Sequence, residues 1–295
     1  MAKIAFIGLG KMGFGVAARM LEAGRQLGVY NRTASRAERL VHPGAHPYDT
    51  PRGACEGADE VVSMLADDAA SQAVWAAHDG ILEADLAKDG FAIECSTLSH
   101  GRVMRLAEGC AARGLRCIDA PVTGLPDAAA AGSLTLLVGA RASDLDAVRD
   151  TPGALCTRII RFGPIGAGTA YKLIINMVGA VQITCAAEAM AIAERAGLDL
   201  AVVAEAIASS QAASPQVVRN AHRMTAGDHQ DNIVVTSALR SKDVDYGLRF
   251  AREIGIGSPF GALAERTYRQ LCELGHEHVN ESTLIDICRS QPVQT

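Results

Sequence analysis

The chain has 295 residues, of which 28 are lysine or arginine and 33 are aspartate or glutamate, giving a formal net charge of −5. That balance, without a basic tail, argues against a protein that binds nucleic acid through its charge. Hydrophobic residues make up 49% of the chain and aromatic residues 4%, which is typical of a soluble globular protein long enough for two domains with separate cores.

The first half of the sequence alternates short apolar runs with helical patterns. The runs that predict strands are residues 3–7, 26–30, 60–65, 91–95, 115–119, 132–140 and 158–163. Helical periodicity lies between them, for example at residues 35–41 and 100–114. Strands that are apolar throughout and alternate with helices indicate a parallel sheet covered on both faces. Residues 1–164 are therefore predicted to form a doubly wound α/β domain.

A glycine motif lies between the first predicted strand and the first predicted helix. In Gly8-x-Gly10-x-x-Gly13, the first glycine permits the tight turn, the second lets the backbone approach a pyrophosphate, and the third permits close packing of helix on strand. The helix N-terminus adds unpaired N–H groups and the positive end of its dipole. Because the motif's position agrees with both neighbouring elements, it predicts a Rossmann-type dinucleotide site rather than a tight turn alone.

The residues after the second predicted strand indicate which dinucleotide is preferred. An NAD site generally has Asp or Glu there, to bind the ribose 2′-hydroxyl. This chain has Asn31 and Arg32 instead, so no carboxylate repels a 2′-phosphate and a guanidinium is available to bind one. We expect NADP as the preferred cofactor, with Arg32 as the main contact and Thr33 and Arg36 assisting. The alternative is that Arg32 stacks on the adenine whether or not the phosphate is present.

The second half of the sequence predicts helices only. Residues 167–196 contain neither proline nor a strong turn signal beyond Gly179, and one helix of that length would span roughly 45 Å. Further helical patterns occupy residues 200–211, 215–225, 238–255, 259–274 and 281–289. Residues 165–295 are therefore predicted to form an all-α domain around one long inter-domain helix. Its apolar faces exceed what one small domain buries, so we expect a homodimer or homotetramer.

Lys172 is the only charged residue in the apolar stretch 168–187. A lysine in such a stretch either extends its ammonium group to water along the helix or faces a cleft in which the amine is used. Asn176, four residues later, projects from the same helix face. The cleft beside a nucleotide domain is the default substrate site, and desolvation there lowers a lysine pKa towards the range of a proton-transfer group. From spacing alone both alternatives stay open, with the catalytic one favoured.

Four stretches of the sequence carry a family likeness. They are FIGLGKMGFGVAARML at 6–21, DAPVTGLPDAAAAGSLTLLVG at 119–139, GAGTAYKLIINM at 166–177 and LRSKDVDYGL at 239–248. Together they resemble the β-hydroxyacid dehydrogenases, the family that includes 3-hydroxyisobutyrate dehydrogenase and tartronate semialdehyde reductase. In that family the first stretch binds the cofactor and the second lines the substrate site. The third carries the catalytic lysine and an asparagine, and the fourth carries a Lys-Asp pair.

The resemblance implies roles for individual residues. Lys172 would be the acid/base and Asn176 its partner, while Thr123, Gly124 and Lys242 would bind the substrate. The residues implied to bind the cofactor are Gly8, Leu9, Gly10, Lys11, Met12, Gly13, Asn31, Arg32, Thr33, Leu65 and Thr97. The implied activity is hydride transfer between NADP(H), with NAD as the alternative, and the hydroxyl or carbonyl carbon of a small 3-hydroxy acid. The candidates are 3-hydroxyisobutyrate, tartronate semialdehyde and a 3-hydroxy amino acid such as threonine or serine.

One departure leaves the substrate open, and two other functions compete with the dehydrogenase. Leu125 stands where the family usually has a second glycine, which reshapes the expected substrate pocket. An imine reductase is similar in fold and cofactor, but such enzymes generally lack the lysine found here. A non-catalytic NADP-binding scaffold of the same fold is the third alternative, although the scaffold members of the family have lost this lysine.

Other features predict no metal site, no membrane span and a cytoplasmic location. The eight cysteines include no CxxC pair and are expected to be reduced thiols. The His-Glu-His sequence at 276–278 has no companion cluster of metal-binding residues. The N-terminal residues lack the pattern of a secretory signal, and polar residues interrupt the long apolar stretch near residue 175.

Overall fold

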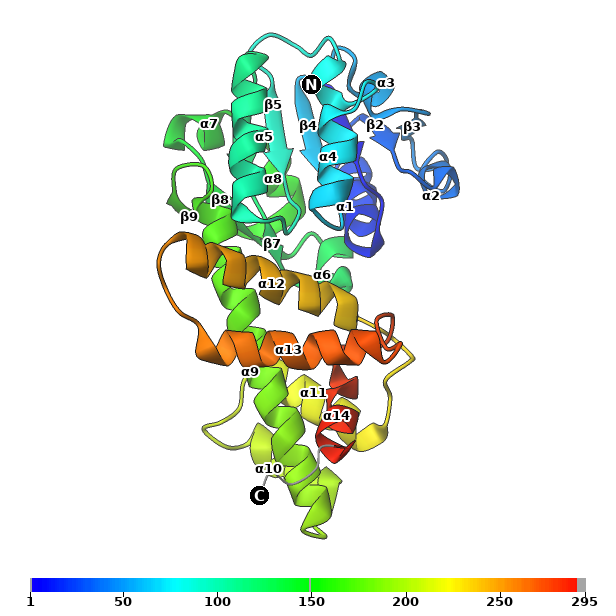
Figure 1. Ribbon diagram of the computed structural model, residues 1–295. Helices are drawn as coiled ribbons and strands as arrows, with labels where there is room; N and C mark the ends of the chain where they lie inside the picture. Colours follow the sequence, from blue (N-terminus) through cyan, green and yellow to red (C-terminus); the bar gives the residue numbers. More distant parts are fainter. Residues whose placement is uncertain (1, 149, 291–295) are drawn as a thin grey trace. The chain divides into compact units, whose positions relative to one another are not determined.

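The computed structural model describes residues 2–148 and 150–290, which form two compact units divided between Lys172 and Leu173 (Figure 1). Each unit has a buried hydrophobic core of its own. The domain boundary predicted after residue 164 lies between the last strand of the sheet, which ends at Gly163, and the long helix that begins at Ala167. The exact position of that boundary stays a prediction.

Nine strands of the described residues form one sheet in the first unit. Their order is β3-β2-β1-β4-β5-β6-β8-β7, and β9 also pairs with β8. They are β1 (Ile4–Ile7), β2 (Leu27–Tyr30), β3 (His46–Pro47), β4 (Glu60–Ser63), β5 (Phe91–Glu94), β6 (Arg116–Asp119), β7 (Val122–Thr123), β8 (Leu134–Gly139) and β9 (Cys156–Gly163). The seven predicted strands are all present, whereas the two-residue strands β3 and β7 were not predicted.

Most neighbouring strands are parallel, as the alternation with helices predicted. β1 lies parallel to β2 and β4, and β5 lies parallel to β4 and β6. The sheet is not parallel throughout, because β8 runs antiparallel to β6 and β7, while β9 is parallel to β8. A continuous apolar run such as residues 134–139 has the same appearance in either direction, so its direction could not be predicted from the pattern.

Helices cover both faces of this sheet, because alternate residues of each strand point to opposite sides. Ile4 of β1 packs in one buried cluster with Val16 of α1, whereas Ala5 packs in another with Trp75 of α4 and Leu106 of α5. In Figure 1, α4 and α5 lie in front of β4 and β5. The helices of this unit are α1 (Lys11–Glu22), α2 (Ala34–Glu38), α3 (Pro51–Cys55), α4 (Asp68–Ala76), α5 (His100–Ala112), α6 (Pro126–Ala130), α7 (Ala142–Ala147), α8 (Asp150–Leu155) and the 3₁₀ helix η1 (Ile81–Glu83). The predicted doubly wound Rossmann-type architecture is confirmed.

Helix α9 (Ala167–Arg195) starts in the first unit and continues into the second, which confirms the single long helix predicted there. By length and composition α9 could cross a membrane, a property that core helices of soluble proteins share, and 39% of its most apolar window is buried. The other helices of the second unit are α10 (Leu200–Ala208), α11 (Pro215–Ala226), α12 (Ser237–Glu253), α13 (Pro259–Glu273), the 3₁₀ helix η2 (Glu281–Thr283) and α14 (Leu284–Ser290).

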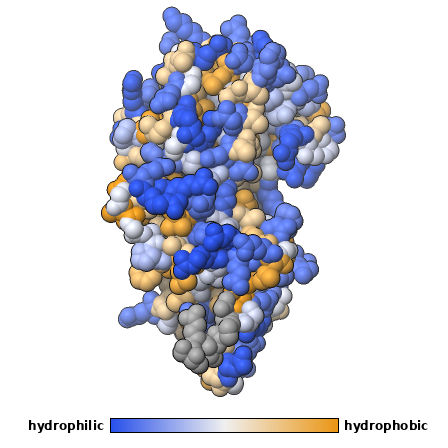
Figure 2. Space-filling model, in the orientation of Figure 1, coloured by the Kyte–Doolittle hydropathy of each residue, from blue (hydrophilic) through white to orange (hydrophobic). Residues whose placement is uncertain are grey.

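The core of the second unit forms around α9. Ile183 and Met190 of α9 are buried in one cluster with Val244 of α12 and Tyr268 of α13. Four of its helices begin at a side chain that caps the first turn, or at a proline in the first turn, which fixes where they start. Apolar side chains also reach the surface of this unit, as the orange areas of Figure 2 show.

Candidate active site

The three glycines of the motif have different surroundings in the structure. Gly8 has φ +100°, and a Cβ there would lie 2.3 Å from the carbonyl oxygen of Met64. A Cβ on Gly13 would lie 2.0 Å from the carbonyl oxygen of Gly8. The fold itself therefore requires both of these glycines. A Cβ on Gly10 would meet nothing within 4 Å, so the space beside Gly10 is open to a ligand rather than filled by protein.

The surroundings of Gly10 fit the pyrophosphate of a dinucleotide. Gly10 is the N-cap residue of α1 and has no side chain with which to cap the helix, so the first-turn N–H groups have no partner from that residue. These groups and the helix dipole favour an anion at this place. The glycines and the helix start thus provide the features that a bound NAD(P) needs, and the predicted residues Leu9, Lys11 and Met12 lie in the same turn.

Asn31 holds the glycine-rich loop against the end of β2. The backbone N–H of Leu9 donates to Asn31 Oδ1 at 2.9 Å, and Asn31 Nδ2 donates to the carbonyl oxygen of Thr33 at 2.9 Å. Both ends of the amide are therefore used, and an aspartate could accept the first bond but could not donate the second. Arg32 and Thr33 are exposed beside this link, where a 2′-phosphate could reach them.

The loops after β4 and β5 are joined through Ser96. Its hydroxyl oxygen accepts the backbone N–H of Leu65 at 2.7 Å, and Thr97 follows it directly in the chain. Leu65 and Thr97, the two residues predicted from the family resemblance to border the cofactor, therefore lie on loops that are hydrogen-bonded to each other. Ser96 itself was not predicted, because a serine beside a strand end carries no sequence signal of its partner.

The first turn of α9 is fixed to the end of β6. Asp119, which is fully buried, accepts the backbone N–H of Thr169 at 2.8 Å and its hydroxyl at 2.6 Å. Burial raises the pKa of Asp119 to about 6, although the bonds from Thr169 oppose that rise. A Cβ on Gly168 would lie 2.2 Å from the carbonyl oxygen of Leu137, so the helix start also needs glycine for its close approach to β8. Lys172, half-buried, stands three residues after Thr169.

The predicted substrate residues Thr123 and Gly124 lie at the end of β7. Both are exposed, and Gly124 has φ +137°, a conformation that side chains rarely adopt. A Cβ there would also lie 2.6 Å from Leu134 Cδ2. Glycine is therefore required by the turn, and its exposed backbone is available to a ligand. Leu125, the residue that departs from the family pattern, is half-buried at the N-cap of α6.

In the second unit, Asp243 brings Asn176 and Lys242 together. Asn176 Nδ2 donates to Asp243 Oδ2 at 2.7 Å, and Lys242 Nζ lies 3.0 Å from Asp243 Oδ1. Arg240 Nη1 donates to the backbone oxygen of Asn176 at 3.4 Å, and Arg240 Nε donates to the buried Glu281 at 2.7 Å. The sequence did not predict this Arg240–Glu281 pair, because the two residues are 41 positions apart and Glu281 lies in none of the four stretches that carry the family likeness.

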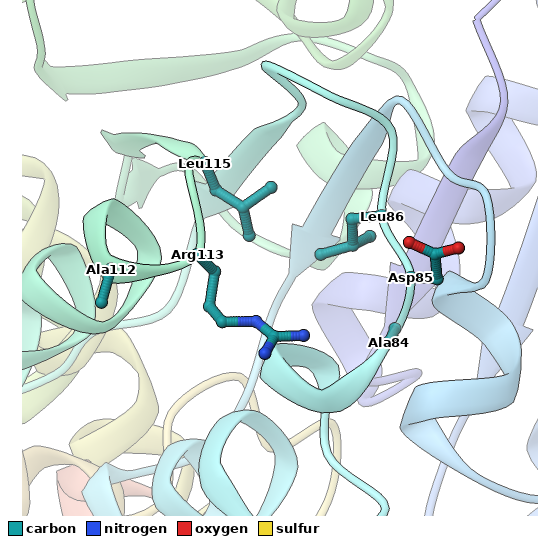
Figure 3. Close-up of a pocket in the computed structure, with 6 residues that line it drawn as sticks. All are labelled: Ala84, Asp85, Leu86, Ala112, Arg113 and Leu115. Atoms are coloured by element: carbon teal, nitrogen blue, oxygen red, sulfur yellow. The ribbon is translucent and has the colours of Figure 1, made fainter.

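A cavity in the first unit lies away from all these residues. It is lined by Ala84, Asp85, Leu86, Ala112, Arg113 and Leu115, and Figure 3 shows Arg113 and Leu115 facing Leu86 and Asp85 across it. These segments precede β5 and β6, whereas the predicted site residues follow the carboxyl ends of the parallel strands. Ligands of open α/β sheets bind at the carboxyl ends, so this cavity is not the cofactor site.

Two family models together match nearly the whole chain. Residues 3–163 match the NAD-binding domain of 6-phosphogluconate dehydrogenase. Residues 166–288 match the model described as NAD-binding of NADP-dependent 3-hydroxyisobutyrate dehydrogenase. The boundary between the two matches falls at the segment between β9 and α9.

Relatives of similar length include named enzymes. An NAD-dependent L-serine dehydrogenase of Pseudomonas aeruginosa is 34% identical over 285 residues, with 94% of each chain covered. A 3-hydroxyisobutyrate dehydrogenase of the same organism is 32% identical, with 94% of this chain and 95% of that one covered. A solved structure of Mycobacterium tuberculosis 3-hydroxyisobutyrate dehydrogenase with L-serine has a TM-score of 0.88 at 26% identity, covering 98% of this chain and all of that one.

Proposed function

The chain belongs to the β-hydroxyacid dehydrogenase family, and from this premise we propose its cofactor preference, its substrate class and its acid/base. As a member it is an NAD(P)-dependent oxidoreductase that acts on a hydroxyl group. We propose that it prefers NADP and acts on a short 3-hydroxy acid or 3-hydroxy amino acid. The observation that carries the proposal is Lys172, which lies one turn from Asn176 on α9, the helix whose start is fixed to the sheet by Asp119.

The proposed chemistry assigns one proton to Lys172. Bound NADP supplies the nicotinamide that takes or returns the hydride. Lys172 Nζ takes the hydroxyl proton of the substrate in oxidation, and the ammonium group returns it in reduction. Asn176 orients the substrate oxygen without adding charge. The Thr123 hydroxyl and the Gly124 N–H hold the substrate carboxylate, and Lys242 supplies a cation for it.

Lys172→Ala tests the assignment of the acid/base. We expect kcat to fall by a factor of about 10² to 10⁴ while NADPH still binds, because the variant lacks the proton carrier but keeps the glycine-rich loop. Lys88→Ala, which removes an exposed lysine just before β5, is the matched control and should leave kcat unchanged. Retained turnover in Lys172→Ala would contradict the proposal.

Arg32→Ala tests the cofactor preference. We expect kcat/KM with NADPH to fall at least tenfold and kcat/KM with NADH to stay the same, because only the 2′-phosphate contact is lost. Arg39→Ala is the control, since Arg39 stacks on the Phe14 ring at 4.4 Å and no role in phosphate binding is proposed for it. If the ratio of kcat/KM with NADPH to kcat/KM with NADH is unchanged in Arg32→Ala, the argument for NADP preference is removed.

A substrate panel tests the proposed class. The L-serine dehydrogenase and 3-hydroxyisobutyrate dehydrogenase relatives support acids of three or four carbons with a hydroxyl on carbon 3. Initial rates with NADP and NAD are measured for L-serine, L-threonine and 3-hydroxyisobutyrate, and in the reverse direction for tartronate semialdehyde. We expect turnover of at least one compound of this class, and turnover of none would overturn the proposal.

A homo-oligomer is proposed from the surface of the second unit. Ile192, Val202 and Phe260 are 63%, 64% and 74% exposed, and we propose that another chain covers these large apolar side chains. Most soluble oligomers consist of identical chains arranged with closed symmetry. Light scattering coupled to size-exclusion chromatography should give the mass of a dimer or tetramer, and a monomer at all concentrations would contradict the proposal.

A further inference from the structure

A buried hydrogen-bond network joins the end of β5, helix α4 and the loop after β4. Glu94 is fully buried, and its Oε2 accepts Trp75 Nε1 at 3.0 Å. Its Oε1 accepts the backbone N–H of Ser96 at 3.0 Å and also the Ser96 hydroxyl. Since the Ser96 oxygen accepts the N–H of Leu65 at 2.7 Å, the backbone of Leu65 is connected through one serine to a buried carboxyl group.

A carboxyl group is a costly choice for this position. Burial raises the pKa of Glu94, and the bonds from Ser96 and Trp75 oppose that rise only in part. An apolar residue of similar volume would fill the same space without a buried polar group to satisfy. The network is therefore better explained by the loops that it holds in place than by a contribution to the stability of the core.

The same two loops are also bonded at a second point. Ser99 donates its backbone N–H to Asp68 Oδ1 at 2.9 Å and its hydroxyl to Asp68 Oδ2 at 2.6 Å. Asp68 opens α4, and Ser99 is the N-cap residue of α5. The loop after β4 and the loop after β5 are thus hydrogen-bonded at two points: Leu65 takes part in the first, and Thr97 lies between Ser96 and Ser99.

We propose that Glu94 and Ser96 are positioning residues that hold the loops carrying Leu65 and Thr97 in the form that binds the cofactor. This inference rests on the proposed function, because it uses the cofactor contacts proposed for those two residues. A loop that is ordered before binding loses less conformational entropy when the ligand arrives. Ser96 acts through the backbone N–H of Leu65, and Glu94 acts by fixing the direction of the Ser96 hydroxyl.

Ser96→Ala tests the link, with Ser71→Ala as its matched control. Both serines are buried, and Ser71 accepts Arg102 Nε at 3.0 Å between α4 and α5 without touching Leu65. Ser96→Ala loses the two hydrogen bonds of its hydroxyl, to Glu94 and from Leu65, whereas Ser71→Ala loses the bond from Arg102, so both should lower the thermal midpoint, Ser96→Ala by more. The Kd of NADPH, measured by calorimetry without substrate, should rise about tenfold in Ser96→Ala only.

Glu94→Gln provides an independent variant with a spectroscopic readout. The glutamine amide replaces one acceptor oxygen by a donor, so it cannot accept from both Trp75 and Ser96. Trp75 is the only tryptophan of the chain, and its emission maximum should shift in the cofactor-free variant. The Kd of NADPH should rise together with that shift.

The outcomes separate this inference from the proposed function. Wild-type protein that binds neither NADPH nor NADH would overturn the proposed function. Wild-type protein that binds, with Ser96→Ala binding as tightly or Ser71→Ala losing as much affinity, would overturn the positioning role alone.

Amide hydrogen exchange of wild-type protein adds a test without mutation. The Leu65 amide should already be protected in the cofactor-free protein, because its bond to Ser96 exists before the ligand arrives. A cofactor-induced slowing of more than tenfold would overturn the inference.

Discussion

Thr169→Val tests whether Asp119 fixes the start of α9. Both residues are buried, and the valine keeps the shape of the threonine while removing the hydroxyl that lies 2.6 Å from Asp119 Oδ1. A hydrogen bond to an ionised carboxylate contributes about 1.5–3 kcal/mol, and one to a neutral group about 1 kcal/mol. We expect the variant to lose about 2–3 kcal/mol of unfolding free energy at pH 8 and about 1 kcal/mol at pH 5.

The direction of this pH dependence follows from the raised pKa of Asp119. In the unfolded chain the carboxyl has a pKa near its ordinary value of 3.8, whereas burial raises the pKa in the folded protein to about 6. Between these values the folded protein binds more protons, so stability is present at low pH and is lost as the pH rises through about 6. Over this range of pH, wild-type protein loses about 3 kcal/mol of unfolding free energy through Asp119. Removing the Thr169 hydroxyl raises the folded pKa further, so the deficit of the variant grows with pH.

Urea unfolding at the two pH values measures the effect, with Trp75 emission reporting on the first unit. Thr184→Val, followed by circular dichroism, is the control on the same helix. Its hydroxyl donates to the backbone oxygen of Ala180 at 2.9 Å, and a carbonyl does not titrate. We expect a small loss there, equal at both pH values. An equal loss at pH 5 and pH 8 in Thr169→Val would refute the reasoning from an ionised Asp119.

Gly13, Gly10 and Arg240 can each be tested by one substitution. Gly13→Ala should abolish soluble folded protein or lower its stability by more than about 4 kcal/mol, because the added Cβ would lie 2.0 Å from the Gly8 oxygen. Gly10→Ala should leave the thermal midpoint unchanged but weaken NADPH binding at least tenfold in calorimetry, since its Cβ enters only the open space. Arg240→Met should cost about 3–5 kcal/mol in urea unfolding, because it leaves the buried Glu281 carboxylate without its closest cation, and a second change, Glu281→Leu, should recover most of that loss.

Helices and strands with a clear apolar pattern could be predicted from the sequence. Strands that exist only because a neighbouring strand pairs with them could not. The runs 60–65 and 91–95 contain enough consecutive apolar residues to predict β4 and β5, and the gap in turn signals after Ala167 predicted α9. The strand β3 consists of His46 and Pro47, which have no apolar pattern and join the sheet only because β2 lies beside them. The direction of β8 could not be predicted for the same reason. It runs antiparallel to β6, and nothing in the apolar pattern of β8 indicates the direction of its neighbour.

The candidate site shows a similar division. Gly8, Gly10 and Gly13 follow a spacing that backbone geometry imposes, and Lys172 and Asn176 follow the helical period, so local patterns were sufficient to select them. The carboxylates that hold the site residues in place were not selected as site residues. Nothing in the sequence near a strand-end Glu or Asp indicates whether a tryptophan 19 residues earlier or a threonine 50 residues later will bond to it.

The two buried carboxyls nevertheless serve separate elements, and this separation can be tested. Glu94 and Asp119 are register partners at the ends of β5 and β6, and the charge of Glu94 adds to the rise in the pKa of Asp119 that burial causes. Asp119, however, bonds to the first turn of α9, whereas Glu94 bonds to α4 and to Ser96. Thr169→Val should therefore lower kcat by displacing the helix of the proposed acid/base, with the Kd of NADPH unchanged. If that variant weakens NADPH binding as much as Ser96→Ala does, the hydrogen bonds of Glu94 and those of Asp119 act together, and the proposed separation is wrong.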